Sequence, residues 1–142
     1  MWTDPRLPTE LIRTAGRPVT LVLDKPLAYR FELHVNTGGP PIWCAIDFRA
    51  TSSGNGLEVR IGAESDEATR RWFPVARDAL LEAARDESDE FSLVVELLCI
   101  HEHPVATTAD AVRHYARSLF GEIARRCVEQ EAVSERRHPT TG

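Results

Sequence analysis

The sequence predicts an α+β fold: a two-layer α/β sandwich in which a mostly antiparallel sheet of four to five strands carries two helices on one face. Two observations predict it. Apolar residues recur at helical spacing in two long stretches, and the other apolar runs are short and rich in β-branched residues. These segments follow one another as four strands, a helix, a strand and a helix. Helices with one apolar stripe each need a common sheet face to cover.

Composition limits the possible functions. The chain has 142 residues, a formal net charge of -5 and three cysteines, Cys44, Cys99 and Cys127. An acidic chain lacks the clustered positive surface that general nucleic-acid binding needs, so we expect no DNA contact and only a local RNA contact. The cysteines lack metal-type spacing and lie in apolar runs, which predicts reduced core residues. No long apolar stretch or signal-like N-terminus occurs, which predicts a cytoplasmic protein without membrane contact.

Clusters of proline and glycine and a polar tract divide the chain into three parts. Residues 1–18 contain Pro5, Pro8, Pro18 and Gly16, which predicts an irregular lead-in. Residues 133–142 are almost entirely polar and predict a disordered tail. Residues 19–132 between them are expected to form one folded domain.

Two strands are predicted at the start of this domain. Val19–Leu23 is a short β-prone run, which an edge position in the sheet would suit. In Ala28–Val35 apolar residues alternate with charged residues and His34, as in a strand with one solvated face, so His34 is expected to face solvent. The glycines and prolines of Asn36–Pro41 then predict a loop.

A β-hairpin is predicted next. Ile42–Phe48 has an extended pattern, and Thr51–Gly56 ends in Asn-Gly, one of the strongest short-range signals for a hairpin turn. Leu57–Ile61 alternates apolar and charged residues and would be the return strand.

A helix followed by a central strand is expected to form the core. Pro74 suits the first position of a helix, which needs no amide hydrogen, so the helix is predicted to begin after Phe73. Its apolar face would consist of Val75, Ala76, Ala79, Leu80 and Ala83. The run Phe91–Ile100 is too short to cross a membrane and is rich in β-branched residues, which predicts a buried strand.

A long amphipathic helix is predicted to close the domain. Thr107 is the expected N-cap, with Asp110 three positions later, where the helix dipole favours an acid. Apolar residues then recur at spacings of three and four from Val112 to Cys127.

Six short motifs follow one another along the domain. They are Thr37-Gly38-Gly39, Ala45-Ile46-Asp47-Phe48, Gly56-Leu57-Glu58-Val59, Trp72-Phe73-Pro74-Val75, Leu93-Val94-Val95-Glu96-Leu97 and Thr107-Thr108-Ala109-Asp110-Ala111-Val112. In order and spacing, from Ala28 to Cys127, this succession resembles domain IV of elongation factor G, the translocase of the ribosome.

The resemblance implies both a fold and a role. The fold would be that of the second domain of small-subunit ribosomal protein five, with a left-handed βαβ crossover around the first helix. The role would be that of a non-catalytic binding module, because in that family the domain is a rigid probe whose tip loops enter the decoding region. The phosphate-binding motif of a GTPase, Gly-x-x-x-x-Gly-Lys-Ser/Thr, is absent from the sequence.

Three functions are compatible with the sequence. The first is a translation-related module, without a cofactor or catalysis, that binds ribosomal RNA or protein through its tip loops and the adjacent helix. The residues expected at that surface are Asn36, Thr37, Gly38, Gly39, His101, Glu102, His103, Arg113 and Arg117. The second is a protein-interaction adaptor that uses the free sheet face or the lead-in and contacts no nucleic acid.

The third function is a small metal-binding protein. Side chains two apart in an extended strand end point the same way, so His101 and His103 could share a zinc ion with Glu102. A further imidazole would come from His34 or His114. Histidines two apart near a loop also occur by chance, so the simpler expectation is that no metal is bound.

Overall fold

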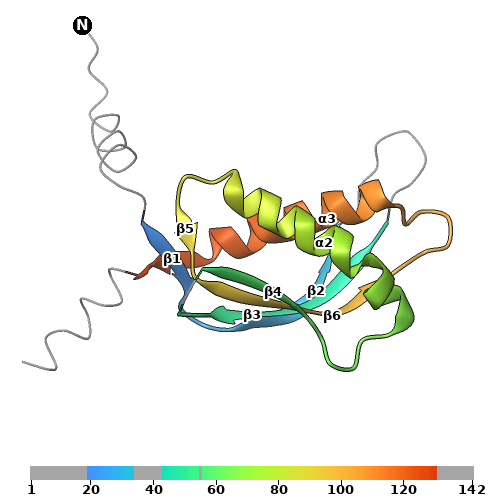
Figure 1. The fold of residues 1–142 in the computed structure, drawn as a ribbon, viewed down its shortest axis with the longest axis horizontal. Coiled ribbons are helices and arrows are strands. Elements are labelled where there is room, and N and C mark those ends of the chain that lie inside the picture. Colours follow the sequence, from blue (N-terminus) through green and yellow to red (C-terminus); the bar gives the residue numbers. More distant parts are fainter. Residues whose placement is uncertain (1–18, 34–42, 55, 131–142) are drawn as a thin grey trace, which may run out of the picture.

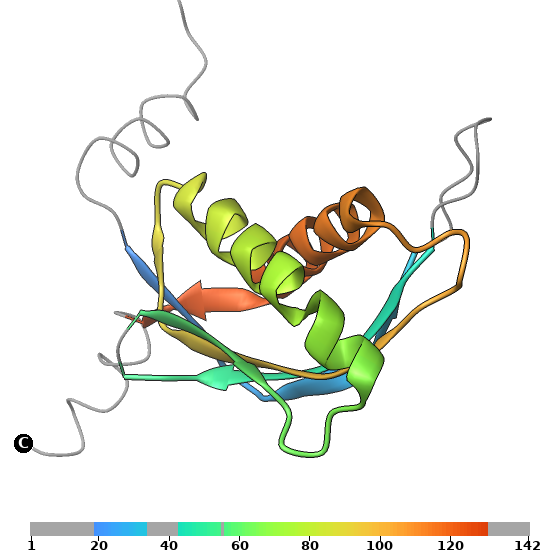
Figure 2. The same ribbon diagram turned by 45° about the vertical axis from the view of Figure 1, so that its right-hand side comes forward.

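A computed structural model describes residues 19–33, 43–54 and 56–130, which form two layers (Figure 1). Two long helices lie next to each other on one side of the sheet layer, and the turned view in Figure 2 shows the same arrangement. The predicted α+β two-layer sandwich is therefore confirmed.

Seven strands and two helices make up the described part of the chain. They are β1 (Thr20–Leu23), β2 (Leu27–Glu32), β3 (Ala45–Ser52), β4 (Leu57–Ile61), α2 (Glu67–Arg85), β5 (Glu90–Phe91), β6 (Leu93–His101), α3 (Ala109–Arg125) and β7 (Cys127–Glu129).

The strands form two sheets instead of the single predicted one. A four-stranded sheet has the order β2-β3-β6-β4, and a three-stranded sheet has the order β5-β1-β7. Pairing is mostly antiparallel, as predicted, although β4 runs parallel to β6 and β1 parallel to β5. β1 is the central strand of its sheet, so its edge placement is wrong. The left-handed hand of the β4–α2–β6 crossover stays a prediction.

The core lies between the helices and the four-stranded sheet. Its largest fully buried side chains include Tyr115 and Leu119 from α3, Leu80 from α2, and Phe48 and Ile46 from β3. Each such side chain stabilises the fold by about 1.5–3 kcal/mol relative to exposure. The small residues of α2, including Ala76 and Ala79, are also buried, which lets this helix approach the sheet closely.

The first helix begins seven residues before the predicted start. α2 starts at Glu67, and Pro74 lies inside it. Asp66 is the N-cap, because its side chain accepts a hydrogen bond from the amide of Thr69. Pro74 cannot donate the usual bond to the carbonyl of Arg70, but the cap and the packing of the first turn outweigh that loss. The predicted start at Pro74 is therefore wrong, because proline is also tolerated within this helix.

The predicted hairpin does not form. β3 and β4 are not hydrogen-bonded neighbours, because β6 lies between them. The amide of Ser53 donates to the carbonyl of Ser92 at 3.0 Å, and the amide of Leu93 donates to the carbonyl of Gly56 at 3.0 Å. The end of β3 and the start of β4 are thus both bonded to the start of β6 instead of to each other. The long apolar β6 takes the centre of the sheet because it can bury side chains against the helices while both of its edges are paired.

Three further boundaries differ from the predictions. The run Phe91–Ile100 splits at Ser92 into β5 and β6, which belong to different sheets. The N-cap of α3 is Thr108, not Thr107. The last helix stops at Arg125, and Cys127 begins β7, which pairs with β1.

The terminal predictions for residues 1–18 and 133–142 lie outside the described residues. Within the described ranges, no helix is long and apolar enough to cross a membrane.

Candidate functional site

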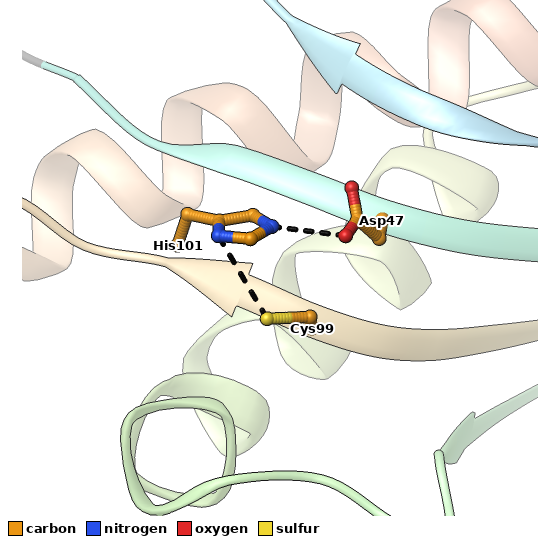
Figure 3. A group of neighbouring side chains, drawn as sticks. All are labelled: Asp47, Cys99 and His101. Carbon is orange, nitrogen blue, oxygen red and sulfur yellow. Dashed lines mark hydrogen bonds and ion pairs between the residues drawn. The ribbon is translucent and has the colours of Figure 1, made fainter.

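Three chemically reactive side chains meet on the four-stranded sheet. Asp47 comes from β3, and Cys99 and His101 come from the end of β6; Figure 3 shows the three side chains gathered over these two strands. One ligand atom of each residue lies within 4.8 Å of the others. His101 Nε2 lies 2.9 Å from Asp47 Oδ2, and Cys99 Sγ lies 3.9 Å from His101 Nδ1.

Cys99 and His101 reach this face because β6 contains a β-bulge. Alternate side chains of Leu93–Leu97 are buried in the core, and strict alternation would bury the side chains at 99 and 101 as well. The register against β3 shifts at this point, with Leu98 as the extra residue. Beyond the bulge Ile100 takes the buried position, so its two neighbours face outward.

Asp47 fixes the orientation of the His101 ring. Its Oδ1 accepts a 2.8 Å hydrogen bond from Arg30 Nε, while Oδ2 faces His101. Burial raises the pKa of Asp47, but the hydrogen bonds from Arg30 and His101 outweigh it and hold the pKa below its usual value. An ionised carboxylate can only accept, so His101 Nε2 carries a proton. In the neutral ring, Nδ1 then presents a lone pair toward Cys99.

Asp66 approaches the cluster from the start of α2. Its Oδ1 accepts from the amide and the hydroxyl of Thr69, at 2.9 and 2.6 Å, while its Oδ2 lies 4.0 Å from Cys99 Sγ. Hydrogen bonds from Thr69 hold the pKa of Asp66 below its usual value. Thr69 Oγ1 also accepts from the amide of Ile100 at 2.9 Å, which fixes the first turn of α2 against the edge of β6.

The surroundings of Cys99 disfavour a nucleophilic thiolate. A thiol, an imidazole and a carboxylate in this order can form a catalytic group, but a nucleophilic cysteine needs a lowered pKa. Burial raises the pKa of Cys99, and the charges of Asp66 and Asp47 raise it further. The net effect raises the pKa of Cys99 and disfavours the thiolate that a nucleophile needs, although Thr69 and Arg30 act in the opposite direction. The side chains of His101 and Asp47 are 31% and 28% exposed, so the cluster is open to solvent.

His103 does not join this cluster. It organises residues 102–108, which we call the tip loop. Its Nδ1 accepts from the amides of Val105 and Ala106, both at 3.1 Å, and its own amide donates to Thr107 Oγ1 at 2.8 Å. The metal site shared by His101 and His103 that the sequence suggests is thus not formed, because the His103 imidazole is hydrogen-bonded within the tip loop.

The tip loop is bonded to the start of the β3 segment. Thr107 Oγ1 donates to the carbonyl of Trp43 at 2.6 Å, and the amide of Trp43 donates to the carbonyl of Ala106 at 3.2 Å. Tyr115 Oη in turn donates to the carbonyl of Leu33 at 2.6 Å. Leu33 and Trp43 flank residues 34–42, so both flanks of that segment lie at the same end of the domain as the tip loop.

The other residues expected at the binding surface are engaged locally. Glu102 accepts from Trp72 Nε1 at 2.5 Å and from Arg71 at 2.8 Å. Arg113 pairs with Asp110 at 2.7 Å, and Arg117 pairs with Asp86 at 2.5 Å. His114 lies edge-on to Tyr115. His34, Asn36, Thr37, Gly38 and Gly39 lie outside the described residues.

Sequence reasoning missed Asp47, Cys99 and Asp66 as members of one site. Cys99 looked like a core residue, and of the three cysteines only Cys44 is fully buried. The available signal was that a histidine follows a cysteine by two positions at the end of an apolar run, because such residues share one face of a strand. The bulge that turns this face outward cannot be recognised from the sequence.

No protein-family model matches the chain, and no curated protein matches it. Among solved structures, it is similar to a crystal structure of a protein from Thermus thermophilus, with a TM-score of 0.55 and 16% sequence identity. The match covers 71% of this chain but only 16% of that protein. At this identity the likeness shows a shared fold, present there as one part of a much longer chain.

Proposed function

We propose that this protein is a non-catalytic binding module like domain IV of elongation factor G, and that it contacts the ribosome with the end of the domain that carries the tip loop. The observation that supports this most is the bonding of the tip loop to Trp43, which follows the predicted loop Asn36–Pro41 closely in the sequence. The shared fold with part of a longer bacterial protein is compatible with it.

The tip loop has the properties of a rigid probe. Four hydrogen bonds involving His103 and Thr107 hold its backbone within the loop. Val105 stands out from it with 80% of its surface exposed, whereas the neighbouring Ala106 is buried. A preorganised loop loses little entropy on binding, and an exposed apolar side chain can be buried by a partner.

Arg113 supplies the nearest positive charge on α3. Its ion pair with Asp110 is exposed, with side chains 49% and 91% accessible. Exposed ion pairs contribute little to stability, so Arg113 can exchange its carboxylate partner for a phosphate at little cost. The contact would then combine the shape of the loop with a small number of charges, which suits an acidic protein better than a broad basic patch.

Co-sedimentation with intact ribosomes and with separated small subunits, at low and moderate salt, tests the proposal. We expect binding to fall for Val105→Asp and for Arg113→Glu. Lys25→Glu is the control, because Lys25 lies in the β1–β2 connection, at the opposite end of β2 from the tip loop. No binding of the unaltered protein at low salt would overturn the ribosomal role. Equal binding by all variants would show that the tip loop and Arg113 do not form the ribosome contact.

A protein-binding adaptor is the second candidate. Charges on the outer face of the four-stranded sheet occur in opposite-sign pairs across strands, such as Arg30 with Asp47 and Arg49 with Glu96. A balanced face suits a protein partner better than a polyanion. Co-purification of one stoichiometric protein that resists RNase, and is lost for Arg49→Glu but kept for Lys25→Glu, would favour this function.

A further inference from the structure

We propose that Cys99 Sγ, His101 Nδ1 and the Asp66 carboxylate bind one divalent transition-metal ion of the zinc type, and that Asp47 holds the His101 ring in position for it. This inference does not depend on the proposed ribosomal role. It differs from the site that the histidine spacing suggested, because His103 takes no part, Cys99 joins His101 on β6, and Asp66 comes from the start of α2.

Two of the three donor spacings are close to those around a tetrahedral ion. With the usual zinc–sulfur and zinc–nitrogen bond lengths, two ligands of this kind lie about 3.6 Å apart. The distance between Cys99 Sγ and His101 Nδ1 is 3.9 Å, and that between Cys99 Sγ and Asp66 Oδ2 is 4.0 Å. Each of these two distances exceeds that value by only a few tenths of an ångström.

Asp47 plays the part that an outer carboxylate plays in many zinc sites. A histidine that binds zinc through one ring nitrogen usually donates its other N–H to a carboxylate, which fixes both tautomer and ring orientation. His101 Nε2 lies 2.9 Å from Asp47 Oδ2 and Arg30 Nε lies 2.8 Å from Asp47 Oδ1, so the carboxylate is itself held in place. The Nδ1 lone pair is left to face the sulfur.

Asp66 can act as a ligand without giving up its role as N-cap. The two functions use different oxygens: Oδ1 accepts from Thr69, and Oδ2 faces Cys99. The backbone of this turn is tied to β6 through Thr69 and Ile100. A metal ion would therefore crosslink the start of α2 to the end of β6.

The mixture of donors selects the class of ion. Sulfur and imidazole disfavour Mg²⁺ and Ca²⁺, which prefer oxygen, whereas zinc and its neighbours accept all three donor types. Binding replaces the S–H bond of Cys99 with a sulfur–metal bond and releases the proton to solvent. The partial exposure of His101 gives the ion a route in, and leaves a fourth position for water.

The test uses the full chain, first stripped with a chelator and then titrated with Co²⁺ and Zn²⁺ separately. We expect one ion per chain and, with Co²⁺, the charge-transfer absorption of a cobalt–thiolate bond. Cys99→Ser should abolish that absorption. Asp66→Asn, which keeps a good N-cap, should weaken binding at least tenfold, and Asp47→Asn should weaken it about 10- to 100-fold.

His114→Gln and Cys127→Ser are the matched controls, because one removes an exposed imidazole on α3 and the other removes a second partly buried thiol. Both should bind like the unaltered protein. In the unaltered protein, Zn²⁺ should also protect Cys99 from alkylation more strongly than it protects Cys127. This measurement does not depend on the folding of any variant. Substoichiometric binding, unchanged absorption in Cys99→Ser, or equal loss in the two controls would overturn the proposal.

Discussion

Gly62 lies directly against the backbone of Leu98. A Cβ placed on Gly62 would be 3.2 Å from the Cα of Leu98 and 3.4 Å from the carbonyl oxygen of Leu97. The amide of Gly62 donates to that same carbonyl at 2.8 Å. The end of β4 thus packs on the bulge of β6, and the bulge is what turns Cys99 and His101 outward.

Replacing Gly62 with alanine should destabilise the protein. The new methyl group would meet backbone atoms, which cannot rotate away, so we expect a loss of about 1–2 kcal/mol in the free energy of unfolding. Gly54→Ala is the control, because nothing lies within 4 Å of its added Cβ. Urea unfolding measures both variants. Equal midpoints for the two variants would show that β6 yields at the bulge, and would contradict this account.

The same bulge marks the limit of what the sequence could predict. The layers and the elements follow from local periodicity, because apolar spacing reports which face of a segment is buried. A bulge changes that face inside one strand without changing the apolar run Leu93–Ile100. The glycine that packs against it lies far earlier in the chain, and local patterns do not contain such an interaction.

Strand order was beyond the sequence for a related reason. Asn-Gly favours a tight turn, but β3 and β4 separate because β6 supplies longer pairing partners for both. The start of α2 depends likewise on tertiary contacts. Thr69 is fully buried and bonded to Ile100, and these contacts extend the helix seven residues before Pro74.

Two other glycines should respond to alanine with opposite signs. Gly121 lies within α3 and Gly56 has a φ of 61°, and a Cβ on either would meet nothing within 4 Å. Alanine in a helix interior gains about 0.5–1 kcal/mol over glycine, so Gly121→Ala should stabilise. Alanine in a left-handed conformation costs about 1–2 kcal/mol, so Gly56→Ala should destabilise. Thermal unfolding of the pair measures both, and shifts of the same sign would refute the conformational argument.

The hydrogen bond from Tyr29 to Glu122 should make stability depend on pH at both extremes. Tyr29 Oη donates to Glu122 Oε2 at 2.9 Å and joins β2 to α3. The bonds from Tyr29 and Arg126 lower the pKa of Glu122 below 4.5, so this contribution is present above pH 4.5 and is lost as the pH falls through the folded value. Burial and the bond to Glu122 raise the pKa of Tyr29 above 10.0, so its contribution is lost as the pH rises beyond 10.0.

Glu122→Gln isolates this dependence. The amide oxygen of glutamine can still accept from Tyr29, but it does not titrate. The loss of melting temperature on the acid side should therefore be smaller in the variant than in the unaltered protein. Glu87→Gln, at an exposed position after α2, serves as the control and should leave the acid limb unchanged. Parallel pH profiles for the unaltered protein and Glu122→Gln would show that Glu122 makes no linked contribution.

The cysteines should differ in reactivity according to their burial. Burial raises the pKa of Cys44 to about 12 and that of Cys127 to about 11, and it also raises that of Cys99. Because the thiolate is the reactive form, Cys44 in the folded protein should react with iodoacetamide on the order of a hundredfold more slowly than a free thiol near pH 8. Cys99 and Cys127 are partly exposed and should react ahead of it. Peptide mass mapping over time measures the order, and in denaturant the three rates should converge. Modification of Cys44 at the rate of a free thiol before unfolding would mean that the core opens far more readily than this packing allows.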